Sequence, residues 1–351
     1  MKIIYGVCGE GLGHASRSRI LIHYLQQHGD EIRIITGGKA HTILSKEFMN
    51  VLKVESPTGF YKGNKVRILY TVLHTLYQTI VRSLVSFHNV RRLMQEFQPD
   101  LVITDSEPIS HITARFSNIK RVSVDNPTAL IYRKHPKRIR DIPAWLFLFF
   151  ALKFSLFGAD KYLIYDFSDE QIDDPRVLFI KPLVQPGILK QRSSSKDHIF
   201  IYQTSLSNTT LFSSLKTFNE TFIIYGFNKE KTDGNMIFKR FNEDEFYQDI
   251  ASAKAVIVNG GFTVISEALF LKKPIFSLPI RHQYEQLFNA NCIHQMGVGV
   301  SHTRFNADYF RCFLSNLESY QRNLQSYDPG NQEEILARIR QEIQYIHQGK
   351  N

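Results

Sequence analysis

Cysteine is scarce in this sequence: three of the 351 residues are cysteine, and their spacing matches neither a metal site nor a disulfide framework. A long hydrophobic run is also lacking. The most apolar stretch, residues 142–157, is shorter than the ~20 residues of a membrane-spanning helix and contains Lys153. No secretory signal precedes the first strand-like segment. We therefore expect a protein of the cytoplasm without disulfides or a metal site.

Positive charge is in excess, because 43 Lys and Arg face 33 Asp and Glu, for a formal charge of +10. An anionic partner is expected, and nucleic acid, an anionic membrane and a phosphorylated substrate are all compatible with that charge. The basic residues form neither an aromatic-interleaved motif nor a recognition helix. A nucleic-acid-binding protein is therefore the disfavoured alternative, and we expect no nucleic-acid partner.

Short apolar strands alternate with amphipathic helices along the chain. In the first part we expect strands at residues 2–7, 31–36, 51–55, 100–104, 121–125, 161–165 and 177–180, with helices at 14–27 and 66–97. The alternation restarts with strands at 198–203, 221–225, 255–258 and 274–278. This order predicts an α/β protein with two doubly wound, Rossmann-like lobes. The predicted parts are an N-terminal domain over 1–184, a linker over 185–195, a C-terminal domain over 196–328 and a helix over 329–351.

The first glycine-rich motif, residues 9–14 (GEGLGH), lies between the first strand and the first helix. Glycines let backbone amides approach a ligand, and a helix N-terminus attracts an anion. The spacing differs from the G-x-G-x-x-G of dinucleotide-binding folds, and no acidic residue follows the second strand. We therefore expect no nicotinamide or flavin cofactor. A tight turn that only permits strand–helix packing is the alternative.

A second motif, residues 259–267 (NGGFTVISE), follows a strand in the second lobe and opens a helix. Amides at 261–263 are placed to receive a diphosphate. Glu267, one turn later, is placed to accept hydrogen bonds from ribose hydroxyls, or to complement the helix dipole. Glu285 and Gln286 follow the next strand and offer donors and acceptors to sugar hydroxyls.

Together these motifs resemble the donor-binding region of GT-B glycosyltransferases, and the likeness is strongest to the inverting branch that includes MurG and the diacylglycerol galactosyltransferases. The segment 9–17 is similar to the acceptor-side loop of those enzymes. The D-x-E-P stretch at 105–108 is shared with a group of uncharacterised MurG-like glycosyltransferases. The resemblance implies a GT-B fold with a cleft between its lobes and a C-terminal helix able to cross back to the first lobe.

The resemblance also implies roles for individual residues. The donor diphosphate would contact Gly260, Gly261, Phe262, Thr263 and Ser205, and the ribose would contact Glu267. The base would contact Arg240 and Phe241, and the hexose would contact Glu285 and Gln286. On the acceptor side, the loop would use Gly11, Gly13 and Arg17. The loop that contains Ser205 lacks the glycine of the family pattern, which leaves fewer open amides for the phosphate.

The implied reaction moves a hexose from a nucleotide diphosphate sugar, UDP-linked in most of the family, to an acceptor hydroxyl with inversion and without a metal. His14 is the first candidate for the general base, since imidazole titrates near neutral pH. Asp105 is either a rival base or the residue that orients His14, and Glu107 is the third candidate. Both acids also suit helix capping. A nucleotide-sugar hydrolase or 2-epimerase on the same fold remains an alternative.

A basic run at 133–140 precedes an aromatic-rich segment at 145–154. This combination is typical of a peripheral contact with an anionic membrane, here through residues 133–157, and favours a lipid or lipid-linked acceptor. The alternative is a buried helix behind a solvated basic loop.

Overall fold

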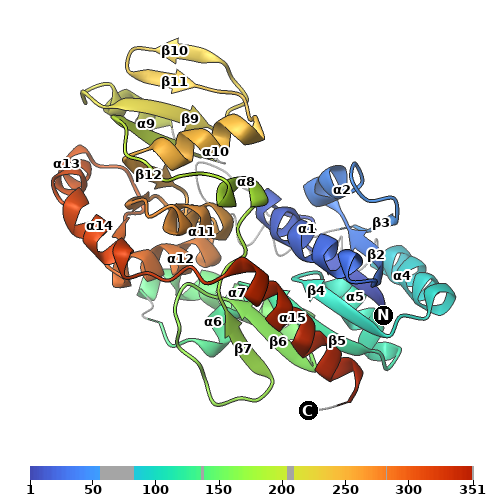
Figure 1. The fold of residues 1–351 in the computed structure, drawn as a ribbon. Coiled ribbons are helices and arrows are strands. Elements are labelled where there is room, and N and C mark those ends of the chain that lie inside the picture. The colour runs from blue at the N-terminus through green and yellow to red at the C-terminus, as the bar shows by residue number, and fades with distance from the viewer. Residues whose placement is uncertain (56–82, 136–137, 204–208, 282, 350–351) are drawn as a thin grey trace. The chain divides into compact units, whose positions relative to one another are not determined.

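The structure is a computed structural model that describes residues 1–55, 83–135, 138–203, 209–281 and 283–349. The chain divides into two compact units (Figure 1). Of the described residues, 1–55, 83–183 and 330–349 belong to the first unit, and those within 184–329 belong to the second.

The first unit is built on a seven-stranded parallel sheet of order β3-β2-β1-β4-β5-β6-β7. Its strands are β1 (Lys2–Val7), β2 (Glu31–Thr36), β3 (Val51–Lys53), β4 (Leu101–Asp105), β5 (Lys120–Asp125), β6 (Lys161–Tyr165) and β7 (Val177–Ile180). The strand order reverses beside β1, which pairs with β2 on one side and β4 on the other. In parallel sheets ligands bind at the carboxyl ends of the strands that flank such a point.

Helices cover this sheet: α1 (Leu12–Gln27), α2 (Gly38–Leu44), α4 (Ser83–Phe97), α5 (Pro108–Phe116), α6 (Ala129–Tyr132), η1 (Ile139–Asp141), α7 (Ile142–Ser155) and α15 (Gln332–His347). The last of these, α15, contacts α1, β5 and β6, so the C-terminal helix returns to the first unit as predicted. Ile339 and Ile343 are fully buried there, and Glu342 pairs with Lys161 of β6 at 3.0 Å.

The second unit has its own seven-stranded sheet, of order β10-β11-β9-β8-β12-β13-β14, in which only the β10–β11 pairing is antiparallel among the described strands. The strands are β8 (His198–Tyr202), β9 (Thr221–Tyr225), β10 (Lys231–Asp233), β11 (Met236–Phe238), β12 (Ala255–Val258), β13 (Ile275–Ser277) and β14 (Gly299–Ser301). The helices are α8 (Pro186–Leu189), α9 (Thr209–Leu215), α10 (Glu243–Ser252), α11 (Phe262–Phe270), α12 (Tyr284–Gln295), α13 (Ala307–Ser315) and α14 (Leu317–Gln325).

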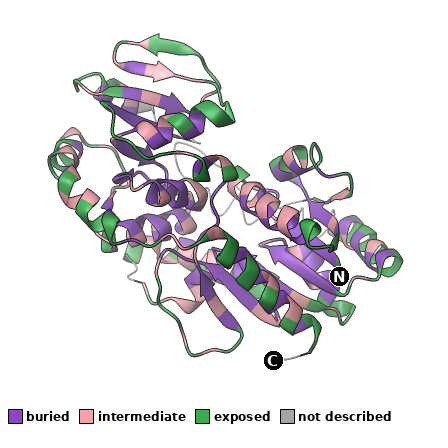
Figure 2. Cartoon of the chain, viewed as in Figure 1, coloured by how far each residue is buried: buried purple, intermediate pink, exposed green. Residues whose placement is uncertain are grey.

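The central strands of both sheets are buried along most of their length, whereas the outer helices carry the exposed residues (Figure 2). Apolar side chains at nearly every position of β1, β4, β8 and β12 explain this, because a parallel sheet is covered on both faces. The predicted α/β class with two Rossmann-like lobes is confirmed.

Several element boundaries differ from the sequence predictions. The strand predicted at 51–55 ends at Lys53, and of the helix predicted at 66–97 the structure describes only α4, because residues 66–82 lie outside the described part. The strands β10, β11 and β14 were not predicted. Each has three residues, too few to show a side-chain alternation.

Gly6 of β1 allows α5 to lie close to the sheet. A Cβ atom at this position would lie 2.1 Å from the Ser110 hydroxyl and 3.0 Å from a Glu107 carboxyl oxygen. We predict that Gly6→Ala destabilises the fold by about 1–3 kcal/mol through overpacking. Urea unfolding would measure it. In a Ser110→Ala background the cost should shrink, and equal costs in both backgrounds would contradict the proposed clash.

Candidate active site

The loop after β1 leaves the N-terminus of α1 open. Gly11 occupies the N-cap position with φ +84, a left-handed conformation that favours glycine, and no described side chain caps the helix. Gly13 and His14 follow in the first turn. The Gly9 carbonyl accepts a hydrogen bond from the Lys39 amide at 3.1 Å, which fixes the loop against α2. The amides of this first turn are thus available to a ligand.

His14, Arg17 and Asp105 form one cluster at the carboxyl ends of β1 and β4. Arg17 donates from Nε and Nη2 to the two carboxylate oxygens of Asp105, at 2.6 and 2.5 Å. His14 Nδ1 lies 2.8 Å from Asp105 Oδ1 and 2.7 Å from Arg17 Nη2. Arg17 and Asp105 are buried, whereas the His14 side chain keeps 14% of its surface exposed.

The Asp105 carboxylate is held in its ionised form. Burial alone would raise its pKa, but the charge of Arg17 and the contacts with His14 outweigh burial and lower the pKa to about 2. Asp105 therefore stays negative at neutral pH, which suits a residue that orients an imidazole better than one that takes up a proton itself.

Glu107 is engaged in capping α5. Its carboxylate accepts hydrogen bonds from the Ile109 amide at 2.9 Å and from the Ser110 amide at 2.7 Å, and also from the Ser110 hydroxyl. The side chain is buried, and burial raises its pKa. Of the two roles considered for Glu107 from the sequence, the geometry favours the helix cap.

Asp125 and Asn126, at the end of β5, were missed in the sequence analysis. Asp125 accepts hydrogen bonds from Ser123 and Thr128. Asn126 donates from Nδ2 to the Tyr165 carbonyl at 3.1 Å, while its buried Oδ1 has no hydrogen-bond partner among the described residues. The available signal was a polar Asp-Asn pair directly after a buried strand. Asn126 Oδ1 can accept a hydrogen bond from a ligand.

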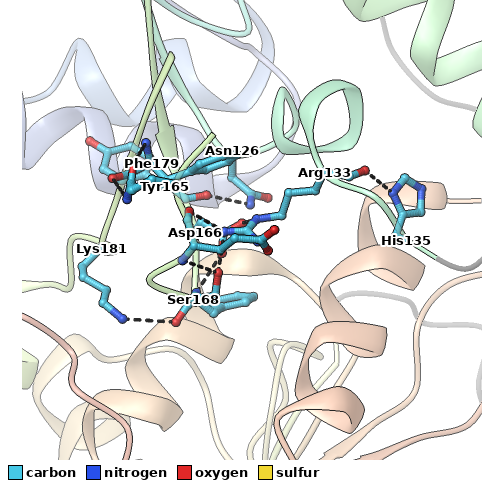
Figure 3. A network of polar contacts seen from close by, with 11 residues as sticks. Asn126, Arg133, His135, Tyr165, Asp166, Ser168, Phe179 and Lys181 are labelled. Carbon is cyan, nitrogen blue, oxygen red and sulfur yellow. Dashed lines mark hydrogen bonds and ion pairs between the residues drawn. The ribbon is translucent and has the colours of Figure 1, made fainter. Parts of the chain in front are cut away.

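Arg133, the first residue of the predicted basic run, is not a free surface charge. It donates from Nε to Asp166 at 2.6 Å, also contacts Ser168 and Glu170, and lies 4.4 Å from the centre of the Phe179 ring. Figure 3 shows the side chain pointing into this group. Arg133 thereby fastens the segment between β6 and β7, and its charge is compensated.

In the second unit, the loop between β12 and α11 is shaped by glycine. Gly260 has φ +112, and a Cβ there would lie 2.8 Å from the Gln286 carbonyl oxygen. Gly261 is the N-cap of α11, and a Cβ there would meet nothing within 4 Å. Phe262 is buried and Thr263 half-buried in the first turn. The N-terminus of α11 is therefore open beside Gly261, whereas the backbone at Gly260 is packed closely against Gln286.

Amide side chains from α12 and from Asn259, the residue after β12, support that loop. Asn289 Nδ2 donates to the Gly260 carbonyl at 3.2 Å, and Gln286 Oε1 accepts from the Ile280 amide at 3.0 Å. Asn259 Nδ2 donates to the Gln203 side chain and to the Leu278 carbonyl, both at 3.2 Å. Gln286 is thus buried and holds the backbone, whereas its neighbour Glu285 is half-buried. No role was predicted for Asn289, Asn259 or Gln203, although Asn259 opens the second motif, because the sequence does not show which backbone groups an amide holds.

Glu267 lies on α11 with only 3% of its surface exposed. No described residue forms a hydrogen bond or ion pair with its carboxylate. Burial, and to a smaller extent the charge of Glu243, raises its pKa to about 8. An acid buried in this way is unfavourable unless a ligand supplies donors, so Glu267 is a strong candidate for a binding residue.

The remaining predicted residues are exposed or lie outside the described part. Arg240 is on the surface within 4.0 Å of Glu230, and Phe241 is 57% exposed and packs against Phe246. Ser205 lies outside the described residues. Within the described ranges no group of three or more His, Cys, Asp or Glu side chains is arranged to hold a metal. None of the described helices has the length and apolar character to cross a membrane.

Comparison with solved structures shows that the fold is that of the GT-B glycosyltransferases. The structure superposes on Arabidopsis thaliana UGT89C1 complexed with UDP with a TM-score of 0.68 at 12% identity, covering 97% of this chain and 99% of that one. For Acinetobacter baumannii MurG the TM-score is 0.61 at 13% identity, with 97% and 99% covered.

Residues 1–318 match the profile of the family described as Glycosyl transferase family 1, and the chain belongs to this family. It is 26% identical over 330 residues to an uncharacterized glycosyltransferase of Methanosarcina mazei, which covers 85% of each chain. The protein is thus a GT-B-type glycosyltransferase.

The raised pKa of Glu267 predicts a pH-dependent stability. The carboxyl is protonated in the folded protein up to about pH 8, whereas its ordinary pKa is 4.5, so its contribution to stability is lost as the pH rises through this range. Glu267→Gln should therefore be more stable than wild type at about pH 8, by about 1 kcal/mol or more, and similar to it at about pH 5. Thermal unfolding at both pH values would measure this.

Glu318→Gln, which changes an exposed acid in the first turn of α14, is the matched control and should follow the wild-type profile. A stability difference between Glu267→Gln and wild type that does not change with pH would show that Glu267 does not titrate in this range.

Proposed function

We propose that the protein transfers a hexose from a UDP-sugar to an acceptor hydroxyl, in one displacement step that inverts the anomeric carbon. The second unit binds the nucleotide sugar and the first unit binds the acceptor. The amides at the N-terminus of α11 stabilise the departing diphosphate, and the proposal therefore invokes no divalent metal. Within GT-B enzymes, we assign the chain to the MurG-like inverting branch on the basis of its motifs.

The observation that carries the donor assignment is the buried carboxyl group of Glu267, which has no hydrogen-bond or ion-pair partner among the described residues. Glu267 lies on α11, whose N-cap is Gly261. Two ribose hydroxyls would supply the donors that this carboxylate lacks. Thr263 and the amides after Gly260 would contact the diphosphate, Glu285 the hexose, and Arg240 with Phe241 the base. Gln286 would act through the backbone that it holds.

The proposed deprotonation of the acceptor hydroxyl depends on His14. Both Asp105 Oδ1, an acceptor, and Arg17 Nη2, a donor, lie at His14 Nδ1. Because Arg17 Nη2 already donates to Asp105 Oδ1, we assign the imidazole proton to Nδ1, directed at the ionised carboxylate, which leaves the lone pair of Nε2 for the acceptor hydroxyl. Arg17 compensates the Asp105 charge and so keeps the carboxylate in place. Asn126 Oδ1 would accept a hydrogen bond from a second donor group of the acceptor substrate.

A lipid-linked acceptor and a peripheral contact with an anionic membrane through residues 133–157 complete the proposal. Its support is α7, which leaves Phe150 63% and Phe154 78% exposed. The interpretation as a buried helix fits α7 less well, since only Ala144 and Leu152 are buried in it. Arg133 does not serve this contact, because Asp166 already pairs with it.

Thermal unfolding with UDP, dTDP, GDP and their common sugar conjugates, without added metal, would test the donor assignment. A ligand that binds only the folded state raises its stability by mass action. We predict stabilisation by the uridine series, with loss of that stabilisation in Glu267→Ala. If no nucleotide or nucleotide sugar of the panel stabilised the protein, the transferase proposal would be contradicted. Turnover of the nucleotide sugar without an acceptor would favour the hydrolase or epimerase alternative.

His14→Ala should lower the rate of sugar transfer by roughly 10²–10⁴, the usual contribution of a general base. Stabilisation by UDP should stay unchanged, because His14 belongs to the first unit. The rate is measured as UDP release from the sugar nucleotide selected by the panel. His23→Ala, on the same helix, is the control and should keep the wild-type rate. Equal rates for both variants would exclude His14 as the base.

A further inference from the structure

The carboxylate of Asp105 is shared between an imidazole and a guanidinium group. Its Oδ1 atom lies 2.8 Å from His14 Nδ1 and accepts from Arg17 Nη2 at 2.5 Å, while Arg17 Nη2 lies 2.7 Å from His14 Nδ1. The three side chains thus form a closed triangle, in which the cation touches the imidazole as well as the carboxylate. Arg17 follows His14 by three residues on α1, so both project from one face of that helix.

The two neighbours of His14 act on the imidazole in opposite directions. A carboxylate beside an imidazole favours its doubly protonated, charged form, whereas a guanidinium disfavours that form. A general base has to be uncharged before it can take up a proton. Asp105 alone would therefore orient His14 and at the same time favour protonation of both ring nitrogens before the acceptor binds. Arg17, at hydrogen-bond distance from the same nitrogen, opposes this second effect.

Other titratable groups surround the triangle on β1, β5, β6 and the segment before α5. Burial raises the pKa of each of them, and they are Tyr5, Cys8, Glu107, Asp125 and Tyr165. The pKa of Cys8 is raised to about 12, so its thiol stays uncharged at neutral pH, as do the two tyrosines. Glu10, in the loop before α1, is a further acid near Cys8. The charges that lie at hydrogen-bond distance from His14 are those of Asp105 and Arg17.

We propose that Arg17 is a positioning residue for the general base, which opposes the attraction of Asp105 for a second imidazole proton and so extends to lower pH the range in which His14 can accept the proton of the acceptor hydroxyl. In the proposed step that proton moves to Nε2, the hydroxyl oxygen bonds to the anomeric carbon, and the electron pair of the broken bond leaves with the diphosphate. Arg17 then repels the positive charge on His14, which favours release of the proton to solvent. This inference rests on the proposed role of His14.

Titration of the histidine rings by NMR tests the charge balance without any substrate. The full chain is labelled with ¹³C in its histidine rings, and the His14 signal is the one that is missing in His14→Ala. We expect Arg17→Gln to move the midpoint of this signal upward by about one pH unit or more, the usual effect of one adjacent charge. Arg17→Lys keeps the positive charge and should stay near the wild-type midpoint.

Arg19→Gln is the matched control, because Arg19 lies two residues later on α1 and pairs with Glu47 at 3.8 Å. It should keep the wild-type midpoint. Arg17→Gln leaves the buried Asp105 without its cation, so a second variant, Arg17→Gln/Asp105→Asn, removes both charges together. Neutral replacement of a buried ion pair is well tolerated in proteins. If Arg17 acts by opposing Asp105, the midpoint of the double variant should return toward the wild-type value.

A wild-type midpoint in folded Arg17→Gln would overturn the proposal, since Arg17 would then only hold Asp105 in place. An equal upward shift in Arg17→Lys would also overturn it, because charge would not be the property that matters. Release of UDP from the UDP-sugar selected by the nucleotide panel should follow the midpoint: the rate of Arg17→Gln relative to wild type should fall as the pH is lowered. A relative rate that does not change with pH would contradict the proposal. Failure of UDP to stabilise the wild-type chain would instead count against the donor assignment, and the NMR result would stand independently of it.

Discussion

The carboxyl edge of the first sheet depends on one ion pair, between Asp105 and Arg17. A buried carboxylate or guanidinium alone would be strongly destabilising, and the two are tolerated because each satisfies the other through two hydrogen bonds. Since Asp105 ends β4 and Arg17 lies on α1, the pair also fixes the helix after β1 relative to the neighbouring strand. His14 is oriented by the same carboxylate, so its position follows from this pair.

The second unit fixes its glycine-rich loop without charge. Neutral amides of Asn289, Gln286 and Asn259 hold the backbone around Gly260 through hydrogen bonds to carbonyl and amide groups. The side chains that hold this loop add no charge, and the N-terminus of α11 is itself a source of positive potential. Glu267, on the same helix, is kept largely protonated at neutral pH by its burial, so it carries little negative charge before a ligand supplies hydrogen-bond donors.

Much of the fold could be predicted from the sequence, because buried parallel strands are apolar along their whole length and the glycine-rich turns stand directly after them. One of the two roles expected for Asp105, to orient His14, requires the two side chains to be close, and they are close because β1 and β4 are neighbouring strands. What could not be predicted depends on distant partners. The sequence does not reveal that Asp166 compensates Arg133 or that Gln286 holds Ile280. It also does not distinguish a capping Glu107 from a reactive one, since both require an acid before a helix.

The return of α15 to the first unit bears on how the chain folds during synthesis. The described residues of the second unit fall within one continuous stretch, 184–329, whereas the first unit is completed only by residues 330–349. Domains fold as units while the chain emerges from the ribosome. The second unit can therefore reach its native state first. At that stage β5 and β6 still lack α15, whose Ile339 and Ile343 are buried in the complete first unit. Until α15 arrives, the surface of β5 and β6 that it contacts stays uncovered on the nascent chain.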